Sequence, residues 1–306
     1  MSQFDLKNIP YQNSRLAIVT GANSGLGYET TLAFAKKGIK TVMACRNLEK
    51  AENAKRKILN EVPEAALDII QIDFAKLESV RSFANEFIAK YDNLDLLVNN
   101  AGVMMPPYEK TDDGFELQMA ANYFGHFLLT GLLIDFLIKT KGSRVISLSS
   151  IAHKNAKIDF QDLQSEIKYS KFKAYGQSKL ACLLFAKELD RRLKNNANGN
   201  TISVAAHPGA SNTELSRHLP KWFSLVLSPI LLLVSHSPKN GSKPIILAAL
   251  EENVEGGDYY GPTGFKEMKG EPGADEVKPQ AEDKEVADRL WRVSESLTKI
   301  TYLNRN

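Results

Sequence analysis

Short apolar runs alternate with longer amphipathic segments along most of this chain. The short runs are rich in β-branched residues, and the segments between them repeat apolar residues at helical spacing. The pattern predicts strands at 16–20, 41–44, 67–72, 94–98, 144–148 and 202–206, and helices at 25–37, 48–59, 77–91, 122–138 and 175–193. Strands that are nearly continuous in apolar residues, each followed by a helix, predict an α/β fold with a parallel sheet covered on both faces.

Right-handed crossovers between such strands give a single-domain, Rossmann-type doubly wound sheet of about seven strands flanked by helices. No linker rich in Pro, Gly or Ser divides the chain, so we expect residues 1–306 to form one domain. The one shift in composition begins at Gly256, where Gly, Pro and charged residues become frequent up to Asp283. We interpret the C-terminal extension, residues 256–306, as a surface loop around a short last strand near Tyr259, followed by a closing helix.

Composition narrows the function mainly by exclusion. The chain is 43% hydrophobic and 25% charged with a net charge of +3, and no basic run is dense enough to indicate nucleic acid binding. Two cysteines and five histidines show no metal-ligand spacing, so no metal is expected. Residues 1–15 lack a signal-peptide layout, and the longest apolar stretch, 222–234, is shorter than the roughly 20 residues that span a bilayer. We therefore expect a cytoplasmic protein without a transmembrane segment.

A glycine-rich turn joins the first predicted strand to the first predicted helix. It reads Thr20-Gly21-Ala-Asn-Ser-Gly25-Leu-Gly27. Such a turn needs residues that accept positive φ, and a pyrophosphate needs close access to the backbone N–H groups at a helix N-terminus. Glycine meets both needs, and the strand-turn-helix context is the one that a dinucleotide-binding turn requires. We expect this turn to bind the phosphates of a nucleotide cofactor.

The G-x-x-x-G-x-G spacing resembles that of the short-chain dehydrogenase/reductase family, and further marks of that family follow in order. An N-N-A-G motif at 99–102 follows the fourth strand, and a P-G-x-x-x-T motif at 208–213 follows the sixth. Asp73 ends the third strand, where the family places an acidic residue against adenine. The resemblance implies cofactor contacts from Gly21, Asn23, Ser24, Gly25, Leu26, Gly27, Arg46, Asp73, Phe74, Asn100, Ala101, Gly102, Tyr175, Lys179, Pro208, Gly209 and Thr213.

The end of the second strand bears on the choice between NAD(H) and NADP(H). An NAD-dependent enzyme usually has Asp or Glu there, which accepts hydrogen bonds from the ribose hydroxyls. This chain has Arg46 after Cys45 and no carboxylate. A guanidinium can pair with a 2′-phosphate through two parallel hydrogen bonds. The family's other basic mark, inside the glycine turn, is missing because Ser24 occupies its place. We expect NADP(H) as the cofactor ahead of NAD(H).

Two Y-x-x-x-K motifs compete for the family's catalytic pair. Tyr169 and Lys173 lie in a lysine-rich polar stretch that we expect to face solvent. Tyr175 opens the periodic helix, and the run Y-G-Q-S-K-L-A matches the family more closely. Residues at i and i+4 share a helix face, so the Lys179 ammonium can lie beside the Tyr175 phenol and also reach the cofactor ribose. The resemblance makes Tyr175 the general acid and base, with Lys179 as its partner.

The resemblance adds two more catalytic residues. Ser150 ends the fifth strand at the carboxyl edge of the sheet, where its hydroxyl would donate to the substrate oxygen. Ser149 is the neighbouring alternative, and Ser150 is preferred because the second serine of such a pair has this role in similar proteins. Asn122 matches the family's helix asparagine, which holds a water that relays protons to Lys179, although asparagine also commonly marks a helix start.

The segment 151–174, between Ser150 and Tyr175, is longer than usual in the family. Together with Ala-Cys-Arg at 44–46 and Ser-Ser-Ile-Ala-His at 149–153, it resembles the retinol-dehydrogenase-like and WW-domain-oxidoreductase-like branch. The insert is either a rim of the active site or a surface loop. An apolar stretch within residues 210–240 is expected to form a substrate lid; a core or dimer helix and a membrane-surface helix are the alternatives.

Together these features predict an NADP(H)-dependent oxidoreductase that interconverts an apolar aldehyde or ketone and an alcohol by hydride transfer. Its expected partner is this small substrate, and the resemblance adds a homodimer or homotetramer. A non-catalytic NADP(H)-binding sensor or scaffold is the alternative, and it would not need the complete set of four catalytic residues. A sugar-nucleotide epimerase shares Y-x-x-x-K, but its glycine spacing does not fit this turn.

Overall fold

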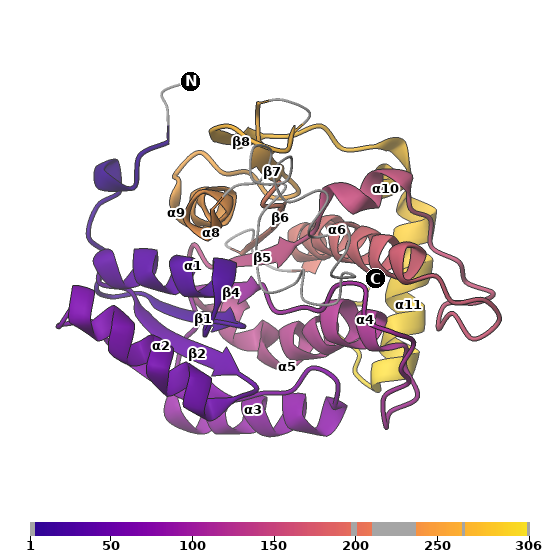
Figure 1. The fold of residues 1–306 in the computed structure, drawn as a ribbon, viewed down its shortest axis with the longest axis horizontal. Helices are drawn as coiled ribbons and strands as arrows, with labels where there is room; N and C mark the ends of the chain where they lie inside the picture. Colours follow the sequence, from indigo (N-terminus) through magenta and orange to yellow (C-terminus); the bar gives the residue numbers. More distant parts are fainter. Residues whose placement is uncertain (1–3, 197–200, 210–236, 265–266, 305–306) are drawn as a thin grey trace, which may run out of the picture.

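The computed structural model describes the chain except for residues 1–3, 197–200, 210–236, 265–266 and 305–306. Within the described residues, an eight-stranded sheet with the order β3-β2-β1-β4-β5-β6-β7-β8 forms the centre (Figure 1). Its neighbouring strands are parallel except for the antiparallel β7–β8 pair. The strands are β1 (Leu16–Thr20), β2 (Lys40–Cys45), β3 (Leu67–Gln71), β4 (Leu96–Asn99), β5 (Arg144–Leu148), β6 (Ile202–Ala206), β7 (Tyr259–Pro262) and β8 (Pro272–Ala274).

Helices cover both faces of the sheet (Figure 1). One face carries α1 (Gly25–Lys36), α2 (Leu48–Glu61), α8 (Pro238–Gly241) and α9 (Lys243–Leu250). The other carries α3 (Leu77–Lys90), α4 (Leu117–Met119), α5 (Gly125–Lys139), α6 (Lys171–Asn196) and α11 (Lys284–Thr298). The shorter elements are η1 (Leu6–Asn8), the π-helix η2 (Ala120–Phe124), the 3-10 helix η3 (Ile151–Asn155) and α10 (Pro279–Glu282).

Each face of the sheet has its own hydrophobic cluster. Successive side chains of a strand point to opposite faces, so Ile18 of β1 packs with α3 and α5, whereas Ala17 and Val19 pack with α1 and α2. All five residues of β1 are buried as a result. This burial on both sides explains why most positions of the strand are apolar and do not alternate with polar ones.

Most of the predicted architecture is confirmed. β5 and β6 have the predicted bounds, and the predicted last strand and closing helix correspond to β7 and α11. The expectation of about seven strands is exceeded by β8, a three-residue antiparallel strand inside the Gly- and Pro-rich C-terminal extension. The predicted helix 122–138 begins earlier, as α4 and η2, before it continues into α5.

The segment Leu117–Lys139 is long and apolar enough to cross a membrane by length and composition alone. In this fold, however, 78% of its most apolar window is buried, because it packs between α3, α6 and the sheet. Tyr302 and Ile300, which follow α11, close over Gly131 of α5, where a Cβ atom would meet the Ile300 side chain at 2.9 Å. The segment is therefore the core helix of the domain.

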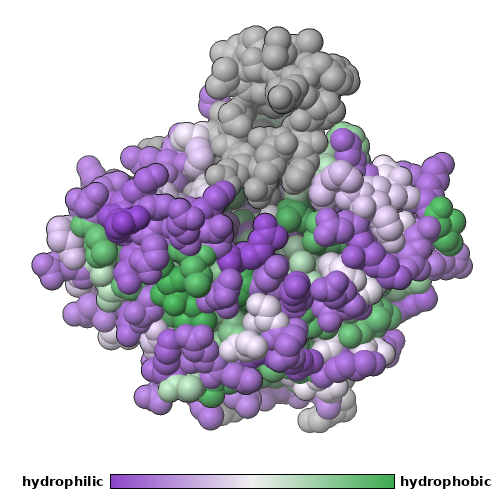
Figure 2. All heavy atoms as spheres, turned by 60° about the horizontal axis from the view of Figure 1, so that its bottom comes forward, coloured by the Kyte–Doolittle hydropathy of each residue, from purple (hydrophilic) through white to green (hydrophobic). Residues whose placement is uncertain are grey.

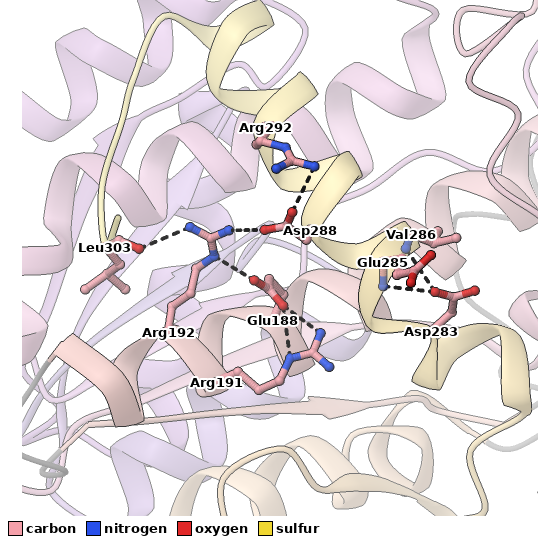
Figure 3. A network of polar contacts seen from close by, with 9 residues as sticks. All are labelled: Glu188, Arg191, Arg192, Asp283, Glu285, Val286, Asp288, Arg292 and Leu303. Carbon is pink, nitrogen blue, oxygen red and sulfur yellow. Dashed lines mark hydrogen bonds and ion pairs between the residues drawn. The ribbon is translucent and has the colours of Figure 1, made fainter. Parts of the chain in front are cut away.

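A buried network of charges fastens α6 to α11 (Figure 3). Arg192 of α6 donates to Glu188 Oε1 at 2.7 Å, to Asp288 Oδ1 at 2.9 Å and to the backbone carbonyl of Leu303 at 3.1 Å. Its guanidinium also lies 4.3 Å from the centre of the Trp291 ring. The network fixes the second half of α6, whose first half carries the predicted Tyr175 and Lys179.

Candidate active site

A cleft lies at the carboxyl ends of the strands, where the order reverses between β1 and β4. Ligands bind at such a switch point in doubly wound sheets, because the loops that leave the two strands diverge there. Fourteen of the predicted site residues line this cleft, namely Gly21, Asn23, Ser24, Gly25, Leu26, Arg46, Asp73, Phe74, Asn100, Ala101, Gly102, Tyr175, Lys179 and Pro208. Gly27, Gly209, Asn122 and Ser150 lie outside its lining, and Thr213 and the predicted lid 222–234 lie outside the described residues.

The glycine turn has the geometry that its sequence predicts. Gly21 and Gly25 have φ angles of +67° and +54°, in a region of backbone conformation that residues other than glycine rarely adopt. Gly27 packs beneath the turn, where a Cβ atom would lie 2.7 Å from Asn100 Nδ2 and would collide with the backbone of Gly21. The side chain of Ser24, the N-cap of α1, makes no capping hydrogen bond. The first N–H groups of α1 therefore remain available to an anionic group in the cleft.

Thr20 joins the glycine turn to the loop after β4, a role that the sequence argument missed. Its hydroxyl oxygen accepts the N–H groups of Asn100 at 2.9 Å and Ala101 at 2.8 Å, and Asn100 Nδ2 donates to the Thr20 carbonyl at 2.6 Å. Thr20 also contacts His126 Nε2 at 3.0 Å. These bonds hold together the two loops that form the floor of the cleft. The sequence offered one signal for this role, the position of Thr20 directly before the first glycine of the turn.

One end of the cleft is cationic. Arg46 and Lys50 line it and are exposed, and Asn47 between them caps α2 by accepting the Lys50 N–H at 2.8 Å. Asp73 and Phe74 also line the cleft, and Asp73 Oδ1 accepts the N–H of Ala75 at 3.1 Å. The sequence argument found Arg46 and missed Lys50, although Lys50 falls in the first turn of the helix that follows. Two cations at this end suit a phosphate group.

Tyr175 and Lys179 meet at the other end of the cleft. Both line the cleft and are buried, with 7% and 5% of their surfaces exposed. Lys179 Nζ lies 5.9 Å from the centre of the Tyr175 ring and donates to the Leu148 carbonyl at 3.1 Å. An ammonium has three donors, so Lys179 has two more for groups that enter the cleft. A Cβ atom on Gly102 would stand 3.7 Å from this ammonium, so the loop after β4 passes directly beside it.

The two candidate serines differ in their surroundings. Ser149 is buried and its hydroxyl donates to the Lys179 carbonyl at 2.9 Å. Ser150 is half-buried, and its oxygen accepts the N–H of Ala152 at 3.2 Å as the N-cap of η3. A hydroxyl that accepts keeps its own proton for donation. Ser149 rather than Ser150 lines the cleft, whereas the Ser150 hydroxyl keeps the donor capacity that the predicted role requires.

Asn122 lies in the π-helix η2, behind the cleft. Its Oδ1 accepts the N–H of Val103 at 2.7 Å, and its Nδ2 donates to the Val103 carbonyl at 3.0 Å and to Ser178 Oγ at 2.9 Å. The side chain thus joins the loop after β4 to α6. Its backbone carbonyl accepts from His126 Nδ1 at 3.1 Å and from Cys182 Sγ at 3.2 Å. Holding a water for proton relay stays a prediction for Asn122.

The lysine-rich stretch around Tyr169 exposes Lys168 and Lys173 as expected, but Tyr169 itself does not point freely into solvent. It is half-buried, its hydroxyl donates to the Pro106 carbonyl at 2.8 Å, and Gln118 Nε2 donates to the hydroxyl at 3.1 Å. Burial, together with the charge of Glu116, raises the pKa of Tyr169 to about 12. A phenol that is held in this way by the chain itself is poorly placed to exchange a proton with a ligand. Tyr169 anchors the insert instead.

The insert 151–174 lies on the surface beside this site. Figure 2 shows that hydrophilic side chains cover most of the described part of one face, with apolar areas between them. The exposed large apolar side chains of the described chain are Tyr11, Leu48, Ile88, Tyr108, Ile167 and Phe172. Ile167 and Phe172 belong to the insert and its junction with α6, and the Tyr108 ring lies 5.1 Å from that of Tyr169. The insert therefore presents apolar side chains to solvent within the segment that ends at the predicted catalytic tyrosine.

Comparisons with known proteins agree with this geometry. The family model described as short chain dehydrogenase matches residues 15–223. Retinol dehydrogenase 13 of Mus musculus is 42% identical over 290 residues, which cover 92% of this chain and 83% of the relative. An uncharacterised protein from Mycobacterium Paratuberculosis has a solved structure with a TM-score of 0.82 and 34% identity, over 98% of this chain and 99% of that chain.

A more distant solved structure is a short chain dehydrogenase from Shigella flexneri 2a str. 301 complexed with NADP. It has a TM-score of 0.61 and 19% identity over 82% of this chain and 98% of that chain, and it shares the fold. The family match runs from before β1 to beyond β6, so it includes the glycine turn, Tyr175 and Lys179. The chain therefore belongs to the short-chain dehydrogenase family of oxidoreductases, in its retinol-dehydrogenase-like branch.

Proposed function

We propose that this protein is an NADP(H)-dependent oxidoreductase that interconverts an apolar aldehyde or ketone and the corresponding alcohol. The observation that carries the proposal is a single cleft with a cationic rim at Arg46 and Lys50 and a buried Tyr175–Lys179 pair at its other end. The glycine turn and the helix N-terminus between them suit a pyrophosphate. The cleft thus fits a dinucleotide that carries a third phosphate.

The chemistry follows from the order of groups along the cleft. Bound NADPH would supply the hydride, and bound NADP⁺ would accept it in the reverse direction. In reduction, the Tyr175 hydroxyl gives its proton to the carbonyl oxygen of the substrate, and in oxidation its phenolate removes the proton of the alcohol. Lys179 stabilises the phenolate by its charge and donates to the cofactor ribose. The Ser150 hydroxyl donates to the same substrate oxygen and stabilises its developing charge.

The preference for an apolar substrate rests on two supports. The relative Retinol dehydrogenase 13 is named for an apolar alcohol, and the segment between Ser150 and Tyr175 exposes the apolar side chains of Ile167 and Phe172. The preference for NADP(H) rests on the cations at the rim and on the lack of a carboxylate after β2. A carboxylate there would repel the 2′-phosphate.

The test compares Tyr175→Phe with Tyr169→Phe, since the two tyrosines open the two competing motifs. NADPH oxidation is followed with a panel of apolar aldehydes and ketones that includes retinaldehyde. We expect Tyr175→Phe to lower kcat by about 10²–10⁴-fold, the usual contribution of a general acid, and Tyr169→Phe to keep the wild-type value. Equal losses in both variants would contradict the assignment. Tight NADPH binding without turnover of any substrate would favour the non-catalytic sensor.

A further inference from the structure

A buried hydrogen bond joins His207, at the end of the cofactor cleft, to Asp275, which lies outside the matched family region. His207 follows β6 and precedes Pro208, which lines the cleft. Asp275 follows β8, which pairs antiparallel with β7 and thereby reaches the neighbourhood of β6. His207 Nε2 and Asp275 Oδ2 lie 2.7 Å apart, and the two side chains are 0% and 6% exposed. The catalytic residues proposed above do not include this pair.

The hydrogen bonds of His207 fix which of its nitrogens carries the proton. The N–H of Gly209 lies 3.2 Å from His207 Nδ1, and a backbone amide can only donate, so Nδ1 accepts. In the neutral ring the proton is then on Nε2, which donates it to Asp275. The Asp275 carboxylate thus selects the tautomer that can hold Gly209. Without it, the ring can take the other tautomer, whose Nδ1–H would oppose the Gly209 N–H.

The surroundings leave both the ring and the turn little freedom. The His207 ring stacks on Tyr259 of β7 with centres 5.1 Å apart, and Gly261 of β7 provides space that a Cβ atom would take from the ring. Gly209 has a φ of +69°, and a Cβ atom on it would meet the Met268 carbonyl at 2.6 Å. The Pro208–Gly209 turn is therefore held from the side away from the cleft by His207.

The same cluster also brings together three side chains able to bind a metal, namely His207, Glu267 and Asp275. Among the described residues, however, the ammonium of Lys154 already forms an ion pair with Glu267. The His207 nitrogen that would face a metal carries the proton given to Asp275. Lys154 thus neutralises one carboxylate and the His207 N–H binds the other, which favours a hydrogen-bonded support over a metal site.

We propose that Asp275 is a positioning residue that acts through His207 to hold the Pro208–Gly209 turn against the nicotinamide end of the cleft. This inference rests on the proposed NADP(H)-dependent function, because it assigns that end of the cleft to the nicotinamide. It gives the C-terminal extension a role in the active site. The adenosine end of the cofactor binds at Arg46, at the far end of the same cleft. Its binding should therefore not change when Asp275 is replaced.

The test measures the dissociation constants of NADPH and of 2′,5′-ADP, which has the adenosine end and the 2′-phosphate but no nicotinamide. We expect Asp275→Ala to weaken NADPH binding and to lower kcat by about tenfold to a hundredfold, the worth of a buried charge-assisted hydrogen bond. Binding of 2′,5′-ADP should stay at the wild-type value. Asp275→Asn should restore NADPH binding, because its amide oxygen can accept the same proton. Glu276→Ala, which removes an exposed neighbouring carboxylate, should change neither constant.

His207→Phe keeps a ring against Tyr259 but removes both hydrogen bonds. If Asp275 acts through His207, the variant that combines His207→Phe with Asp275→Ala should lose no more NADPH affinity than His207→Phe alone. An Asp275→Ala variant that binds NADPH like the wild type would overturn the proposal, as would an equal loss of 2′,5′-ADP affinity or additive losses in the double variant. If Asp275→Ala fails to fold, Asp275→Asn and His207→Phe carry the test. Failure of the wild type to bind either ligand would instead overturn the proposed cofactor.

Discussion

Two arginines bind the same carboxylate of α11 from very different environments, which gives a matched pair of perturbations. Arg192 Nη2 lies 2.9 Å from Asp288 Oδ1, and Arg292 Nη2 lies 3.0 Å from Asp288 Oδ2 (Figure 3). The Arg192 side chain is 5% exposed, whereas that of Arg292 is 69% exposed. Replacing each by Met removes one cation and keeps an unbranched apolar stem.

The structure predicts very different costs for the two changes. Arg192→Met removes the cation shared by Glu188, which is fully buried, and Asp288, and it also removes the stacking on Trp291. Removing one partner of a buried pair costs about 3–5 kcal/mol. Glu188 keeps its contact with Arg191 and Asp288 keeps its contact with Arg292, but both remaining cations are more exposed than Arg192, so we expect a cost near the lower end, about 3 kcal/mol. Arg292→Met breaks an ion pair whose cation is in solvent, and such pairs contribute about 0–1 kcal/mol. The free energies of unfolding should therefore differ by at least about 2 kcal/mol.

Urea unfolding followed by far-UV circular dichroism measures both values against the wild type. The m-value serves as the internal control, because an unchanged m-value shows that the two transitions expose the same surface. NADPH turnover by folded Arg292→Met should equal that of the wild type. If the two variants lose the same free energy within about 0.5 kcal/mol, burial does not govern this network and the reasoning is refuted.

Two further changes test the cofactor cleft, and a third prediction concerns the buried His126, which contacts Thr20. Gly27→Ala should abolish measurable NADPH binding, since its Cβ atom collides with the backbone of Gly21; calorimetric titration checks this, and wild-type affinity would contradict the geometry. Arg46→Ala should raise the NADPH dissociation constant by about tenfold to a hundredfold and leave that of NADH unchanged. Burial lowers the pKa of His126 to about 3. Below about pH 6.5 this histidine therefore takes up a proton in the unfolded state but not in the folded state. The folded state consequently loses stability as the pH falls. Between about pH 7.5 and pH 5 the wild type should lose about 2 kcal/mol more than His126→Gln in urea unfolding, and equal losses would show that His126 is not buried in its neutral form.

The features that the sequence predicts best are those that depend on the local pattern of residues. β5 and β6 have the predicted bounds because each is a short, mostly apolar run, and the glycine turn has the predicted positive φ angles. Tyr175 and Lys179 meet because i and i+4 side chains share a helix face. These features depend on neighbours within a few residues, so the pattern is enough to predict them.

Features that depend on distant parts of the chain escaped the prediction. β8 has three residues with no strand pattern of their own, and it exists because β7 offers an edge. Tyr169 was expected in solvent, but its hydroxyl reaches Pro106, 63 positions away. His207 and Asp275 are 68 positions apart, and no local spacing relates them. The role of Thr20 as an acceptor from two loop amides also needs the fold, because those amides belong to the turn after β4.

The measurement that tests the central claim most directly is the ratio of kcat/KM with NADPH to kcat/KM with NADH, for the wild-type protein and an apolar aldehyde. The cations at the rim and the missing carboxylate after β2 predict a ratio above about tenfold in favour of NADPH, the least that one charge-assisted pair should contribute. A ratio at or below one, with measurable turnover, would contradict the NADP(H) assignment and the role given to Arg46.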